Sequence, residues 1–80
     1  MVSATKRKKR FARMLTERWG EKPHLYNADL HEPYPQEICK RLERKGCKCE
    51  VMPSIREEYA YRDYLNVWSN CKFTRDVISR

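Results

Sequence analysis

Long apolar runs, a secretory leader and catalytic signatures are all missing from this sequence. No apolar stretch approaches the roughly 18 residues that a membrane-spanning helix needs. The basic N-terminus is followed by no apolar segment, so we expect no secretory signal. Glycine-rich phosphate loops, the HExxH motif and the GxSxG elbow are absent as well. A chain of 80 residues also seldom forms a deep pocket, so we expect a binding protein and not an enzyme.

Glycine is scarce, with two residues, while 36% of the side chains are charged. This composition is unlike that of a low-complexity linker or a disordered acidic tail. The length limits the chain to one domain, whose small core depends on its large aromatic rings. We predict an α+β fold with about three helices, a short two-stranded β element and a basic N-terminal helix.

Acidic side chains are missing from the first sixteen residues, and nearly all of the net charge lies in this part of the chain. Residues 1–20 hold seven basic side chains and one acidic one, which is +6 of the total of +7. So uneven a distribution indicates a polyanionic partner, because neutralised phosphates release counterions. A nuclear import signal, an anionic membrane surface or a solvated tail would use the same charges. The candidate nucleic-acid-binding residues are Lys6, Arg7, Lys8, Lys9, Arg10, Arg13 and Arg18.

The apolar spacing predicts a helix over residues 4–19 that Gly20 terminates. Its apolar face is dense only from Phe11 to Trp19, so we expect that half to dock and the basic start to project outward. Residues 21–35, rich in proline, are predicted to be an ordered connecting loop.

Residues 36–80 are predicted to form a compact helix–strand–helix scaffold. A helix over 36–45 ends at Gly46, and alternating side chains over 47–52 indicate a half-buried strand. Ser54 to Glu57 matches a capping box, which predicts a helix over 55–69. A strand over 61–68 is the alternative, since tyrosine, valine and tryptophan also suit strands.

The rest of the chain completes this scaffold. Residues 71–74 are predicted to be a short strand paired with 47–51, and the C-terminal residues to fray. The core is expected to bring together Leu42, Val51, Leu65 and Trp68.

Four tyrosine and tryptophan side chains between residues 59 and 68 suggest either a core stripe or a platform on which unpaired bases stack. So small a chain needs its large rings inside, which favours the core. Tyr59 falls outside the stripe and is the candidate for an exposed ring, while Trp19 is a second candidate for stacking or for anchoring a partner.

Four cysteines without a signal peptide indicate free thiols in a reducing, cytoplasmic compartment, with nuclear and mitochondrial locations as alternatives. With His24 and His31, these cysteines number enough ligands for one zinc ion. A structural zinc site usually has two close ligand pairs, and only one CxC occurs here. We therefore predict no metal, no other cofactor and no disulfide. The cysteines are Cys39, Cys47, Cys49 and Cys71.

The function that this sequence favours is non-enzymatic binding of RNA or DNA phosphates through the basic helix, as a ribonucleoprotein component or a small regulator. The alternative is an adaptor or inhibitor, of the kind that viruses and mobile elements encode, that binds an acidic surface of a host protein.

Overall fold

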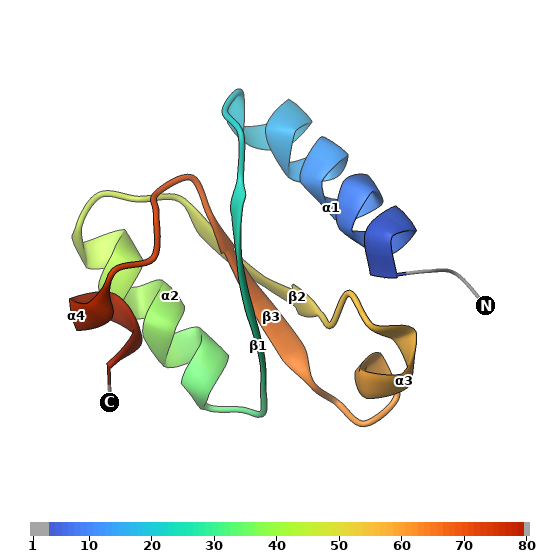
Figure 1. Ribbon diagram of the computed structural model, residues 1–80. Coiled ribbons are helices and arrows are strands. Elements are labelled where there is room, and N and C mark those ends of the chain that lie inside the picture. Colours follow the sequence, from blue (N-terminus) through green and yellow to red (C-terminus); the bar gives the residue numbers. More distant parts are fainter. Residues whose placement is uncertain (1–3, 80) are drawn as a thin grey trace.

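The structure, a computed structural model, describes residues 4–79, which form four helices and three strands (Figure 1). The predicted α+β class is confirmed, and the whole is one small domain. In chain order the elements are α1 (Ala4–Trp19), β1 (His24–Leu30), α2 (Tyr34–Arg44), β2 (Cys49–Pro53), α3 (Glu57–Ala60), β3 (Leu65–Ser69) and α4 (Arg75–Ile78).

The sheet has three strands in the order β1-β3-β2, and not the two that the sequence predicted. Both outer strands run antiparallel to β3, so β1 and β2 are parallel and α2 connects them. This is a split β–α–β unit with β3 inserted between its strands. Val67, at the centre of β3, lies opposite Tyr26 of β1 and Val51 of β2.

Helices cover both faces of this sheet, with α1 on one side and α2 and α4 on the other (Figure 1). Neighbouring side chains of a strand point to opposite faces. Val67 therefore packs with Ile38 and Leu42 of α2, whereas Trp68 packs with Phe11 and Leu15 of α1. The predicted single core is wrong in this respect. Leu42 and Val51 do share a cluster, but Trp68 belongs to the cluster on the opposite face, and Leu65 is only half-buried.

The first two predicted helices are present. α1 spans the predicted 4–19 and ends at Gly20, whose φ of +73° suits glycine. α2 begins two residues earlier than predicted, with Pro35 in its first turn, and is followed by Gly46 at φ +87°.

The predicted loop over 21–35 is wrong, because its middle is the edge strand β1. Pro23 precedes the strand and Pro33 follows it, so these prolines lie outside β1 and do not interrupt its pairing. The register shifts between Tyr26 and Leu30, which is a bulge or irregularity in the pairing with β3. Such a shift disturbs the alternation of side chains from which a strand is recognised.

The predicted helix over 55–69 is also wrong. Only Glu57–Ala60 is helical, and Leu65–Ser69 is the central strand, which lies largely within the alternative over 61–68. From Asn66 to Ser69 every residue of β3 is buried, because helices cover both faces. In such a strand apolar and polar residues no longer alternate, and the apolar Leu65, Val67 and Trp68 also fit a helical stripe.

The segment after β3 departs from the prediction as well. Residues 71–74 form no strand, and β2 pairs with β3 instead. The C-terminal residues do not fray over the described range, since α4 buries Val77, which is 1% exposed, against α2. Arg41 of α2 donates hydrogen bonds to the carbonyls of Val77, at 2.9 Å, and Ser79. An ion pair joins Lys45 to Asp76.

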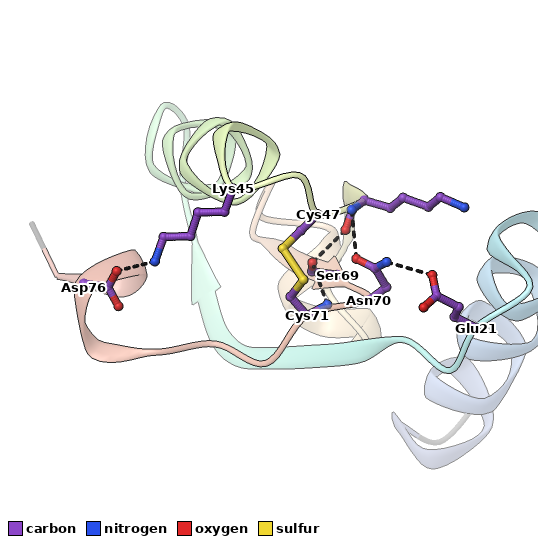
Figure 2. The surroundings of a disulfide bond; sticks show 8 residues. Glu21, Lys45, Cys47, Ser69, Asn70, Cys71 and Asp76 are labelled. Carbon is purple, nitrogen blue, oxygen red and sulfur yellow. Dashed lines mark hydrogen bonds and ion pairs between the residues drawn. A yellow bond between two sulfur atoms is a disulfide. The ribbon is translucent and has the colours of Figure 1, made fainter.

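All four cysteines are bonded, in the pairs Cys39–Cys49 and Cys47–Cys71. Figure 2 shows the second of these bonds. The prediction of free thiols and no disulfide is therefore wrong. The Cα atoms of the pairs are 5.5 and 5.9 Å apart, within the range that a disulfide spans. Cys47 and Cys49 do not bond to each other. Cys49 of β2 bonds to Cys39 of α2, and Cys47 in the turn after α2 bonds to Cys71 in the segment after β3.

Candidate nucleic-acid interface

α1 presents two different sides. Phe11 and Leu15 are buried against Trp68 and Met52 of the sheet, with the rings of Phe11 and Trp68 edge to face at 6.5 Å. The docking half of the helix is therefore the predicted one. The opposite side carries exposed cations, because residues three and four apart lie on the same side of a helix. Six of the seven predicted basic residues are exposed: Lys6, Lys8, Lys9, Arg10, Arg13 and Arg18.

Arg7 is the exception, because its guanidinium faces the fold. Nη2 donates a 2.9 Å hydrogen bond to the backbone carbonyl of Ser54, between β2 and α3. The same guanidinium lies 5.2 Å from the centre of the Phe11 ring. Arg7 thus ties the start of α1 to the sheet, and this contact competes with binding a phosphate.

The carbonyl that Arg7 reaches belongs to a buried polar cluster. Ser54 and Asn66 are both fully buried. The Ser54 hydroxyl donates to Asp29 at 2.6 Å, and the Asn66 amide donates to the same carboxylate oxygen at 2.9 Å. Asn66 Oδ1 in turn accepts from the backbone N–H of Ile55. Satisfied buried polar groups fix a conformation, so this cluster gives Arg7 a rigid support.

The predicted capping role of Ser54 is not observed. Its hydroxyl accepts from the N–H of Arg56 and donates to Asp29, and the residue preceding α3 is Arg56. No sequence signal identified this cluster, since Asp29, Ser54 and Asn66 lie on three separate segments.

The other end of α1 is held by charge. Arg18 forms an ion pair with Glu50 of β2, and Lys48 donates to the carbonyl of Trp19 at 3.2 Å. Trp19 itself is half-buried and packs against the α1 side of the core. The indole predicted as an exposed anchor is therefore partly used by the fold.

The first ten residues of α1 carry five exposed cations, which we call the basic face: Lys6, Lys8, Lys9, Arg10 and Arg13. Four of them, all but Lys8, line a shallow concavity of about 240 Å³ on the helix. The Arg10 guanidinium lies 5.3 Å from the centre of the Phe11 ring, which restrains it. Glu17, the acid of this helix, follows Arg13 by one turn. The basic face thus concentrates charge on a helix whose opposite side is fixed.

Between residues 59 and 68, the exposed aromatic ring is that of Tyr61 and not that of Tyr59. Tyr61 is 83% exposed. Tyr59 is half-buried, with its ring 5.5 Å from that of Tyr64 and with the Arg56 guanidinium 5.4 Å from its centre. The helical stripe predicted over 55–69 had placed Tyr61 inside, and the turn that follows α3 turns it outward. Tyr61 and Arg7 line one shallow concavity, so this ring lies near the start of α1.

The histidines and cysteines form no common site. His24 begins β1 and His31 follows its end, so the strand holds them roughly 20 Å apart. The His31 ring stacks on Tyr64 with centroids 4.0 Å apart. The disulfides engage all four cysteine sulfurs. Within residues 4–79, no three His, Cys, Asp or Glu side chains gather as a metal site would require.

The chain matches no family model, no curated protein and no solved structure. Among the described residues, no helix combines the length and the apolar character needed to span a membrane.

Proposed function

We propose that this protein is a non-enzymatic binding protein that contacts RNA or DNA phosphates through the basic face of α1. The observation that carries the proposal is the division of α1 into a buried apolar side and an exposed cationic side. Lysine and arginine side chains held on one rigid helix neutralise successive phosphates and release their counterions.

The contacts that hold α1 support this proposal. A cation on a free tail loses conformational entropy when it binds, whereas one on a docked helix has lost much of it already. Phe11 and Leu15 dock the helix on the sheet, and Arg7 fixes its start. The basic face is thus presented in one orientation.

Salt dependence tests the proposal. Four to six phosphate contacts predict a slope of log affinity against log salt concentration of roughly −3 to −5. The measurement is fluorescence anisotropy of labelled RNA and DNA oligonucleotides between low and physiological salt. Absence of binding at low salt, or binding that does not change with salt, contradicts the proposal.

A second candidate function is the adaptor or inhibitor that binds an acidic protein surface. One observation favours it: Tyr61 exposes its ring close to Arg7, and aromatic side chains next to arginine are typical of anchors in protein interfaces. Tyr61→Ala discriminates between the two. It should abolish capture of an acidic protein partner, while it leaves the salt slope of oligonucleotide binding unchanged.

From the two disulfides we infer an oxidising compartment. The expectation of a reducing, cytoplasmic location rested on free thiols, and all four cysteines are bonded. Disulfides persist in oxidising environments. Mass spectrometry of alkylated protein from its natural source, without reductant, tests which condition applies.

A further inference from the structure

A groove of about 440 Å³ lies between α1 and β1, beside the basic face. Its cationic side chains are Lys8 and Arg13 on α1, and Lys22 in the connection to β1. His24 and Leu25 of β1 and Trp68 of β3 also line it. None of the described residues that line the groove is acidic. A concavity with this charge favours an anion.

Trp68 adds a second and independent feature. The residue is 1% exposed, and its indole Nε1 is buried without an acceptor among the described residues. Buried indole N–H groups usually have a hydrogen-bond partner. Because Trp68 also lines the groove, this N–H is a local reporter of what binds there.

We propose that this groove binds one unpaired nucleotide of a single-stranded nucleic acid. Its phosphate would lie among Lys8, Arg13 and Lys22, and its base against Leu25 and the neighbouring apolar wall. This inference rests on the proposed function and narrows it, because it assigns a preference for single strands. The volume suits such a unit, since ligand sites of roughly 300–1,000 Å³ hold small molecules.

The shape of the groove explains why a duplex is disfavoured. A base that enters a concavity must leave its stack and its pair, and this cost is smallest for a base that is already unpaired. The basic face alone contacts backbone phosphates and accepts either form. The groove is therefore the part of the molecule that discriminates between them.

Nuclear magnetic resonance provides a direct test, because the chain has two tryptophans and hence two indole N–H signals. The Trp19→Phe variant assigns the signal of Trp68. The ¹⁵N-labelled protein, with its disulfides intact, is titrated with an oligothymidylate of about twelve nucleotides, and separately with the same strand in a duplex. We expect the Trp68 signal to shift with the single strand, at the concentrations at which the α1 amides shift, and to shift little with the duplex.

Charge variants give the second measurement. Lys22→Gln should weaken single-strand binding about three- to tenfold and duplex binding less, because one phosphate contact is lost. Lys40→Gln is the matched control. Lys40 is an exposed lysine of α2, on the opposite side of the sheet, and its loss should leave both affinities unchanged.

The outcomes separate this inference from the proposed function. If both oligonucleotides bind through α1 while the Trp68 signal stays fixed and Lys22→Gln binds normally, the groove assignment is wrong and the proposed function stands. Equal shifts of Trp68 with duplex and single strand overturn the strand preference. If neither oligonucleotide binds at low salt, the proposed function is wrong, and the groove has no ligand of this class.

Discussion

On one face of the sheet, two disulfides and α4 hold α2 in place, whereas on the other face α1 is held by an apolar stripe and by cationic contacts. Cys39–Cys49 joins α2 to β2, and Cys47–Cys71 joins the turn after α2 to the segment after β3 (Figure 2). Described contacts of α1 include Phe11 and Leu15 in the core, Arg7 on the Ser54 carbonyl and Arg18 on Glu50.

This difference has a physical basis. A domain of 80 residues buries only about 60% of its unfolded surface, so its stability is small unless other constraints contribute. Cross-links on the α2 face supply such a constraint by restricting the unfolded chain. The α1 face can then carry a cluster of like charges, whose mutual repulsion opposes compactness. We infer that the two faces divide stability and binding between them.

The largest expected effect comes from removing the disulfides. Each bond should contribute about 2–4 kcal/mol, with the pair that is 24 residues apart contributing slightly more than the pair 10 apart. The double variants Cys39→Ala/Cys49→Ala and Cys47→Ala/Cys71→Ala should each lower the Tm by about 10–20 °C. Calorimetry measures this shift. An unchanged Tm in either variant would show that its bond does not hold the α2 face.

Leucine substitutions on the two faces sharpen the comparison. Leu42, at 1% exposure, and Leu15, at 0%, pack on opposite sides of the sheet. Each change to alanine should cost about 2–5 kcal/mol, measured by chemical denaturation. The two variants should differ in which backbone amides lose their protection from hydrogen exchange. In hydrogen exchange, Leu15→Ala should release mainly the α1 amides, because α1 has no cross-link, and Leu42→Ala should raise exchange across the sheet.

Equal patterns of exchange in the two leucine variants would argue against independent faces. If Leu42→Ala keeps wild-type stability, the packing of α2 on the sheet is wrong. Because a domain of this size has only about 5 kcal/mol of stability, denaturation should start from conditions in which both variants are folded, such as low temperature.

Removing the charges of the basic face should change binding and leave stability unchanged. The triple variant Lys8→Ala/Lys9→Ala/Arg10→Ala should lower oligonucleotide affinity at least about a hundredfold at low salt, because three cations are lost. All three side chains are exposed, so the Tm should stay within a few degrees of wild type.

A matched variant removes the same charge from exposed residues outside α1: Lys40→Ala, Arg44→Ala and Lys72→Ala. It should bind nearly as well as wild type. A similar loss of affinity in both variants would indicate that overall charge, and not the basic face, governs binding.

The smallest expected effect concerns Asp76 on the α2 face. The hydrogen bond from Lys45, with a further one from Thr74, lowers the pKa of this exposed carboxyl from its usual 3.8 to about 2. The folded state thus favours the carboxylate. The resulting stabilisation is present above pH 3.8 and disappears as the pH falls toward 2. Lys45→Gln should return the midpoint toward 3.8 in an NMR titration, whereas a midpoint that does not move would mean that the ion pair does not form.

The sequence by itself determined the elements with local signals. α1 and α2 carry apolar positions at helical spacing and glycine at their ends, so their limits were predicted within two residues. The basic residues likewise lie in one continuous segment, so their concentration could be recognised without knowing which other segments of the chain they meet. Six of the seven basic residues that were predicted from the sequence to bind nucleic acid have exposed side chains on α1.

Only the tertiary structure decided the features that depend on contacts between distant segments. β3 was predicted as part of a helix because both of its faces are covered, which removes the alternation that marks a strand. The disulfides depend on which segments meet, and spacing along the chain does not contain that information. The contacts of Arg7 and Trp68 depend on tertiary structure in the same way. Arg7 meets the Ser54 carbonyl, and Trp68 lines the groove beside α1, only once the sheet has brought together residues that are far apart in the sequence.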